Sequence, residues 1–258
     1  MPKLVKLLTQ ALQRLQTQLL MSHEQLTLQQ NDEALHHLRV NLRQLRSLLH
    51  PLRADLDEAM CLDELVKKTM TSTNSIRDRE VLILELRHQQ MFDLAQGYQH
   101  NLQTAYLHVA QQPELEAIHQ RLISFPQYLQ FSMSASTSQR LEKRICQQWK
   151  QRSRKLFKLI QQKQQDKHRL RILIKQLRYN SETYQAILPK HSRAQIQKLT
   201  LLQEVLGTWH DYFVFLTCAQ QQPELNVLIP IWQEQLQHWE HESVHAMKKL
   251  KRDKSFTL

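Results

Sequence analysis

The segment ALHHLRVNLRQLR, residues 34–46, has the spacing of an amphipathic helix with two distinct faces. At about 100° per residue, one narrow arc of this helix holds only cations, namely His36, Arg39, Arg43 and Arg46. The neighbouring arc is filled by leucines, at Leu35, Leu38, Leu42, Leu45 and Leu49. Like charges one turn apart mildly destabilise a helix. The stacked arginines therefore do not serve the stability of the helix itself.

The composition of the whole chain favours helix nearly everywhere. Its 258 residues include only 2 glycines and 7 prolines, leucine and glutamine are abundant, and β-branched residues are sparse. The formal net charge is +11, which indicates an anionic partner such as nucleic acid, a membrane surface or a polyphosphorylated compound.

Targeting signals and metal-binding cysteine motifs are missing. Cys61, Cys146 and Cys218 are isolated, without a CxxC pair, so neither a disulfide framework nor a zinc knuckle is expected. The N-terminal MPKLVKLLTQALQRLQ is amphipathic and lacks a signal-peptide core, and no apolar run is long enough to cross a bilayer. We expect a cytoplasmic protein that does not span a membrane.

The periodic segments and the breaks between them predict a series of helices. The expected ranges are 3–21, 33–50, 54–70, 76–96, 98–111, 114–130, 138–162, 167–187, 191–206, 210–221 and 226–251. The cluster 71–75 should start the fourth helix, and Pro113 and Pro223 sit at helix starts, where proline is tolerated. Gly207 is expected to end a helix as its C′ residue. The stretch SMSASTS, 132–138, is the most linker-like.

The opening motif recurs in the second half of the chain, at residues 166–179, DKHRLRILIKQLRY. Each cationic position returns at an offset of 132, as His168, Arg171, Lys175 and Arg178. Six of eleven residues are identical between 36–46 and 168–178. A second pairing follows at an offset of 133, between Arg77-Asp78 and His210-Asp211. The same order of elements occurs twice, so the chain contains a duplicated helical unit.

The repetition favours a functional interpretation of the cations. Solvated faces have no reason to repeat the same cations while other outward positions, such as Asn41 and Leu173, diverge. Arginine donates bidentate hydrogen bonds to phosphate oxygens, and histidine is protonated more readily beside phosphate. We therefore expect two cationic helix faces to converge between the halves and bind a polyanion. Asp78 and Asp211 are expected to orient arginines, and Arg144 and Arg154 of the basic helix 138–162 are weaker candidates.

Four motifs, in this order, resemble the CHAD family of all-helical, histidine-containing domains: HHLRVNLRQLR, SIRDREVL, DKHRLRILIKQLRY and LLQEVLGTWHD. The resemblance extends from about residue 3 to 250. It implies an all-α fold with two pseudo-symmetric four-helix-bundle-like halves around a basic central cavity, and binding of inorganic polyphosphate, with localisation to polyphosphate granules. The implied phosphate ligands are His36, Arg39, Arg43, Arg46, His168, Arg171, Lys175 and Arg178. Supporting residues would be Arg77, Asp78, Tyr179, His210, Asp211, Arg144 and Arg154. Gln44 and Gln176 stand where the family commonly has a further basic residue.

The resemblance also implies a stand-alone binding module rather than an enzyme, because the ExExK string of the triphosphate-tunnel domains that often accompany this family is missing. We expect a single domain, 1–258, with halves at about 3–131 and 138–251 joined by a linker at about 132–138, and no cofactor or metal. The oligomeric state stays open.

Two alternatives remain beside polyphosphate binding. The basic stripes could bind nucleic acid. A metal-dependent helical-bundle enzyme would use Glu-x-x-His strings, which occur at Glu85/His88, Glu116/His119 and Glu242/His245. Near the C-terminus, Glu234, His238, His241 and His245 also share a helical face. None of these strings is repeated at an offset of 132.

Overall fold

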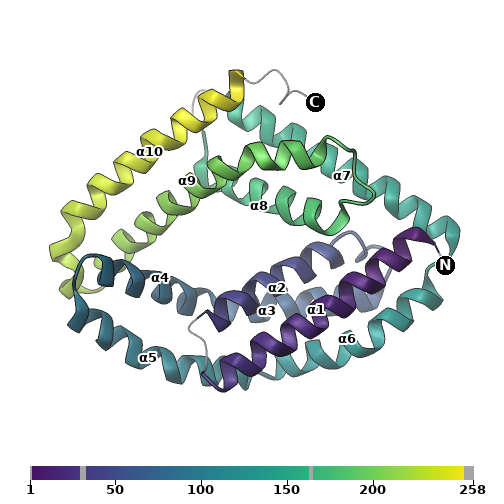
Figure 1. Cartoon of the computed structure of the whole chain (residues 1–258), viewed down its shortest axis with the longest axis horizontal. Coiled ribbons are helices and arrows are strands. Elements are labelled where there is room, and N and C mark those ends of the chain that lie inside the picture. The colour runs from purple at the N-terminus through teal and green to yellow at the C-terminus, as the bar shows by residue number, and fades with distance from the viewer. Residues whose placement is uncertain (1, 30–32, 163–164, 253–258) are drawn as a thin grey trace. The chain divides into compact units, whose positions relative to one another are not determined.

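The computed structural model describes residues 2–29, 33–162 and 165–252, and within these ranges it contains helices and no strand (Figure 1). The elements in order are α1 Lys3–Thr27, α2 Ala34–Leu49, α3 Asp57–Ser72, α4 Asn74–His88, α5 Phe92–Ala110, α6 Pro113–Ser132, α7 Ala135–Gln161, α8 Lys167–Tyr184, α9 Ser192–Ala219, the 3-10 helix η1 Pro223–Leu228 and α10 Ile229–Arg252. The predicted all-α class is confirmed. None of the helices in the described ranges is both long enough and apolar enough to cross a membrane.

The chain divides into two compact units, Met1–Ile145 and Cys146–Leu258. The boundary falls inside α7 and not in the expected linker at 132–138. Only Met133 and Ser134 separate α6 from α7.

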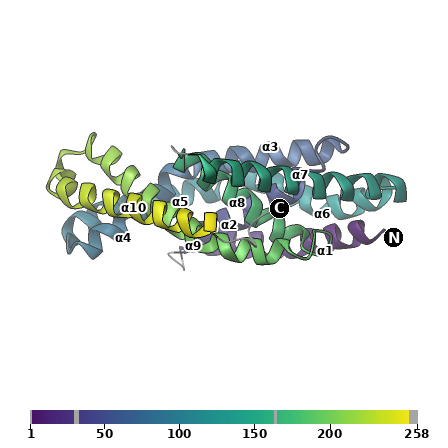
Figure 2. The same cartoon turned by 90° about the horizontal axis from the view of Figure 1, so that it is seen from above.

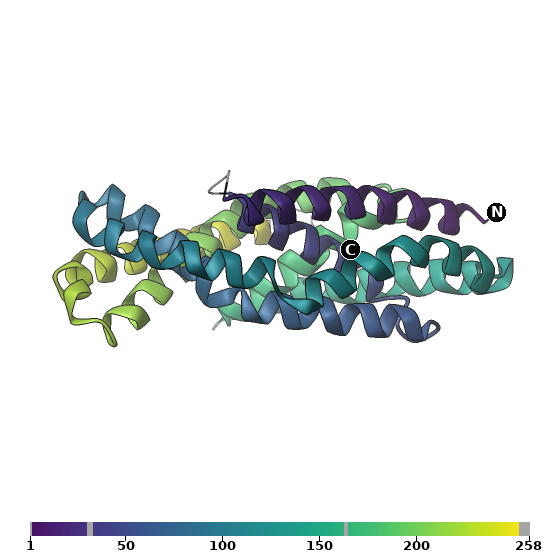
Figure 3. The same cartoon turned by 90° about the horizontal axis from the view of Figure 1, so that it is seen from below.

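Unit 1 is built around the leucine face of α2. Leu35, Leu38, Leu42 and Leu45 are all 0% exposed, as the arc of leucines predicts. The α1 helix packs against α2 and α6, and α6 lies between α1 and α3, as Figures 2 and 3 show from opposite sides. The α4 and α5 helices pair as a hairpin. Burial of these apolar faces supplies the stability of the unit, at roughly 25 cal/mol per Å² of apolar surface.

A pair of histidines joins three helices of unit 1. His23 of α1 and the buried His119 of α6 approach to 3.0 Å between Nδ1 and Nε2, with stacked rings. The Nε2 of His23 lies 2.7 Å from the carbonyl oxygen of Ala110, at the end of α5. Since a carbonyl only accepts, Nε2–H of His23 donates to Ala110. Burial and the neighbouring His23 lower the pKa of His119.

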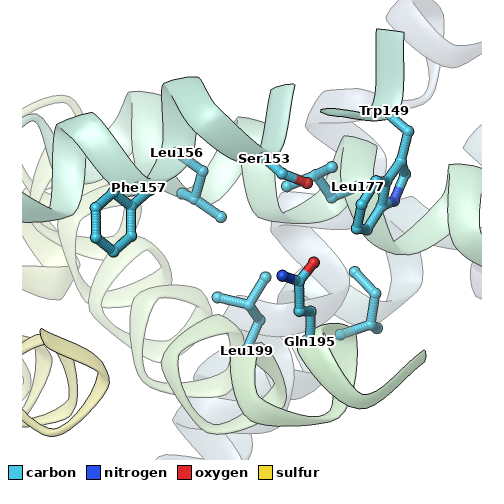
Figure 4. A pocket seen from close by; sticks show the side chains of 8 residues that line it. Trp149, Ser153, Leu156, Phe157, Leu177, Gln195 and Leu199 are labelled. Atoms are coloured by element: carbon cyan, nitrogen blue, oxygen red, sulfur yellow. The ribbon is translucent and has the colours of Figure 1, made fainter. Parts of the chain in front are cut away.

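Unit 2 is built around α9, which packs against α8 and α10. Its largest buried side chains include Trp149, Tyr184 and Trp232. The indole N–H of Trp149 donates to the Ser181 hydroxyl at 2.9 Å, which ties α7 to α8. Beside Trp149 is a cavity of about 10 Å³, lined mostly by apolar side chains, with Ser153 and Gln195 as its polar groups (Figure 4). This volume is close to the minimum needed for one water molecule.

Several helix boundaries differ from the sequence expectation. The first helix, expected to end at residue 21, continues to Thr27, and the last begins at Ile229, after the 3-10 helix η1, instead of at 226. The chain breaks at 89–91 instead of near residue 97, and Gln90 there has a left-handed φ of 60°. Bonds from Met91 N–H to Leu86 O and from Gln90 N–H to Arg87 O form a Schellman motif, with glutamine where glycine is usual. Gly207 does not end a helix, because α9 continues through it to Ala219. The start of α4 at Asn74 and of α6 at Pro113 agree with the prediction.

Candidate functional site

The cationic arc of α2 has three partly buried side chains and one that is almost enclosed. His36, Arg43 and Arg46 are partly buried, whereas Arg39 is only 7% exposed. The guanidinium of Arg39 donates to Met70 O at 3.0 Å, to Asn74 Oδ1 at 2.9 Å and to the Thr73 hydroxyl. Arg39 thus holds the corner between α3 and α4. Burial, the neighbouring Arg43 and Arg77 lower its pKa to about 10, against the opposing charge of Asp78.

Arg46 has a carboxylate partner inside unit 1. Its Nε lies 3.2 Å from Asp63, which is fully buried and also accepts from Arg53 at 2.6 Å. A buried carboxylate between two arginines is strongly held, since loss of either partner leaves an uncompensated charge. Arg46 nevertheless keeps 38% of its side chain exposed.

His36 lies close to Arg77 of α4. Its pKa is lowered by burial and by the charges of Arg77, Arg43 and His37, against Glu33. Arg77 itself donates to the buried Glu80 at 2.8 Å, and Glu80 also accepts from the Tyr106 hydroxyl at 2.7 Å. Burial raises the pKa of Glu80, while the hydrogen bonds from Arg77 and Tyr106 oppose that rise. Glu80 and Tyr106 therefore position Arg77 beside His36, and neither residue was predicted from the sequence as part of the site.

The α8 helix of unit 2 presents the repeated cations beside α9. The rings of His168 and His210 are 5.7 Å apart between centroids. Burial and the charges of Arg171, His168 and Lys175 lower the pKa of His210 to about 4. The pair His168/His210 corresponds to His36/Arg77 of unit 1, so positions related by the duplication meet in both units.

Arg178 is the last of the repeated cations on α8. Its Nε lies 3.5 Å from Glu182, and its guanidinium lies over the buried ring of Tyr179 at 4.7 Å. Tyr179 therefore supports Arg178 by a cation–π contact. Asp78 and Asp211 are exposed and partly buried, respectively, and the charge of Asp78 acts on Arg39.

The sequence matches the CHAD domain over residues 10–220. The chain belongs to the CHAD family. Among solved structures, the crystal structure of the CHAD domain from the plant Ricinus communis is similar, with a TM-score of 0.66 and 21% identity. The match covers 98% of this chain and 89% of that chain, and at this identity it shows the fold. The comparison with curated proteins gives no match.

The two remaining supporting candidates of this CHAD protein lie on α7. Arg144 donates to Pro51 O at 2.8 Å and pairs with Asp55, so it ties α7 to the turn after α2. Arg154 is exposed. Neither contact of Arg144 involves the cationic arc of α2, and its place is that of a structural anchor.

Two of the Glu-x-x-His strings make side-chain contacts in this CHAD protein, those at Glu116/His119 and Glu85/His88. His119 pairs with His23, and Glu116 accepts from Gln120 at 2.7 Å. Glu85 lies 3.9 Å from His88. Among the described residues, no group of three or more His, Cys, Asp or Glu side chains is arranged to hold a metal ion.

Proposed function

We propose that this CHAD protein binds inorganic polyphosphate through two cationic faces, without cleaving it. The α2 face comprises His36, Arg43, Arg46 and Arg77, and the α8 face comprises His168, Arg171, Lys175, Arg178 and His210. One observation supports this most directly. In both faces burial and neighbouring cations together lower the pKa of a histidine, His36 in one and His210 in the other, so like charges lie close together in each face. An anion placed there relieves this repulsion.

The chemistry of the side chains fits a chain of phosphates. Arginine offers a planar fork that matches two phosphate oxygens, and lysine offers a point charge that adapts to a flexible ligand. Arg39 also belongs to the ligands implied by the family, but its terminal nitrogens already donate to the α3–α4 corner. We therefore place Arg39 in support of the α2 face and expect Arg43 and Lys175, at equivalent positions, to contribute most.

Replacing both Arg43 and Lys175 by Ala should weaken the binding of long-chain polyphosphate. Each lost phosphate contact reduces the release of counterions, so the slope of log affinity against log salt should flatten by about one to two units. Titrations of the purified protein at several salt concentrations measure both quantities.

A charge-matched control is available at the end of α10. Lys248→Ala with Lys249→Ala removes the same net charge from two exposed positions outside both faces. We expect this variant to keep nearly its full affinity. Equal losses from the two double variants would show that only the bulk charge matters and would contradict the proposal.

Two assays separate this function from its alternatives. If polyphosphate is the main ligand, it should displace DNA from the protein at equal phosphate concentration. Polyphosphate incubated with the protein and Mg²⁺ or Mn²⁺ should keep its length, and phosphate release proportional to protein concentration would refute the non-catalytic assignment. In cells that accumulate polyphosphate granules, the fluorescently tagged protein should localise to them, and the Arg43/Lys175 variant should not.

A further inference from the structure

An aromatic pair lies beside the α8 face. The rings of Trp209 and Phe213, one turn apart on α9, are stacked with centroids 6.0 Å apart and planes inclined by 24°. Phe213 is 51% exposed, so one of the largest apolar side chains of α9 faces water. Inorganic polyphosphate has no apolar part, and the proposed function therefore leaves this pair unused.

The aromatic pair lies beside the start of α8. Lys167 of α8 lies over the Trp209 ring, 5.7 Å from its centroid, and pairs with Glu240 of α10 at 2.5 Å. The residue after Trp209 is His210, which meets His168 of the α8 face. Lys167 and the His168/His210 pair therefore lie next to the stacked rings, on the side where the α8 face begins.

The duplication shows that this pair is particular to unit 2. At the offset of 133, Trp209 corresponds to Ile76, and Phe213 corresponds to Glu80. Both residues of unit 1 are buried, and Glu80 holds Arg77. The two copies share the cations but differ where unit 2 has the exposed aromatic ring, so the duplicated scaffold does not itself require an aromatic residue there.

We propose that the α8 face binds nucleoside polyphosphates, with the nucleobase stacked on Phe213 and the phosphates on the α8 cations. This inference rests on the proposed function, since the same cations hold the phosphates. Exposed aromatic rings beside cations are a common platform for nucleobases, because every base has a π-face. A single ring pair offers room for one base, whereas single-stranded nucleic acid uses a series of such platforms. This favours a mononucleotide.

The test compares ATP with inorganic tripolyphosphate, without divalent cations and at one salt concentration. The two ligands have the same number of phosphates and differ by the nucleoside. We expect ATP to bind about 10-fold more tightly, which is within the range of one base–aromatic stack. Phe213→Ala should abolish this preference and leave the affinity for tripolyphosphate unchanged. Quenching of Trp209 fluorescence by ATP gives a second readout.

The control is Phe131→Ala, which removes an aromatic ring that is 90% exposed on α6 of unit 1. It should keep the preference for ATP. If tripolyphosphate does not bind at all, the proposed function itself fails. If tripolyphosphate binds but ATP binds no better, or if Phe213→Ala keeps the preference, only the nucleotide inference is overturned. An oligonucleotide that binds far more tightly per nucleotide than ATP would replace the mononucleotide with single-stranded nucleic acid.

Discussion

Arg39 and Arg43 lie one turn apart on α2, yet they differ in how much solvent they retain. Arg39 is almost fully buried, and its guanidinium is held by the end of α3 and the start of α4. Arg43 is partly buried and repels both Arg39 and His36. The hydrogen bonds of Arg39 offset the cost of burying its charge, whereas Arg43 lies among other cations that disfavour its charge.

Arg39→Ala should therefore destabilise the protein more than Arg43→Ala. Loss of the Arg39 guanidinium leaves buried acceptors at the α3–α4 corner unpaired and opens a cavity, so we expect a loss of about 2–4 kcal/mol in the free energy of unfolding. Arg43→Ala should change it by less than about 1 kcal/mol, because repulsion within the α2 face is relieved. Chemical denaturation of both variants measures the difference. Equal stability losses would mean that Arg39 has no special structural role.

At the scale of the helices, Gln90 stands where the backbone conformation favours glycine, and Gly207 stands inside a helix, where a residue with a Cβ is favoured. Gln90 adopts the left-handed conformation of a helix C′ residue, which favours glycine. Gly207 lies inside α9 without a positive φ, and a Cβ added there would meet no atom within 4 Å. Glycine in a helix interior costs stability because the unfolded chain gains freedom.

Gly207→Ala should consequently stabilise the protein by about 0.5–1 kcal/mol. Gln90→Gly should also stabilise it, by up to about 1 kcal/mol, because the left-handed strain at the Schellman motif is removed. The matched control is Gly97→Ala in α5, where an added Cβ likewise meets no atom within 4 Å. Thermal or chemical denaturation of the three variants tests these values. A destabilised Gly207→Ala would show that α9 needs flexibility at this point.

These two positions explain why the helix boundaries were only partly predictable. The leucine periodicity predicts α2 and its buried face correctly, because leucines spaced three and four residues apart all lie on one side of a helix. Local signals at helix ends are weaker, and tertiary packing overrides them at Gln90 and Gly207. The cations of α2 and α8 were visible in the sequence as a repeat. The burial of Arg39 was not, because its acceptors come from a segment about thirty residues further along the chain.

At the scale of the whole molecule, one buried and two partly buried imidazoles connect stability to pH. Burial and neighbouring charge lower the pKa of His36, His119 and His210 in the folded protein, that of His210 to about 4. The unfolded chain binds these protons near pH 6.5, at higher pH than the folded protein does. The contribution of these groups to stability is therefore complete above pH 6.5 and decreases as the pH falls below it, for His210 down to about pH 4.

The free energy of unfolding should accordingly be lower at pH 5 than at pH 7.5. His210→Gln should reduce this pH dependence, because one of the titrating groups with a lowered pKa is removed. His88→Gln is a suitable control, since the His88 side chain is 76% exposed. Urea titrations across this pH range provide the measurement. An unchanged slope in His210→Gln would show that His210 keeps its ordinary pKa.

The contact between His23 and His119 also has a spectroscopic consequence. The Nε2–H of His23 donates to the carbonyl of Ala110, so in a neutral His23 ring Nδ1 has no proton and accepts. The proton between the two rings therefore belongs to Nε2 of His119. Because His119 is buried, that ring proton exchanges slowly with water and should give its own cross-peak in ¹H–¹⁵N spectra of labelled protein. The peak would act as an intrinsic probe of whether the first and sixth helices remain docked, with no reporter group attached to the protein.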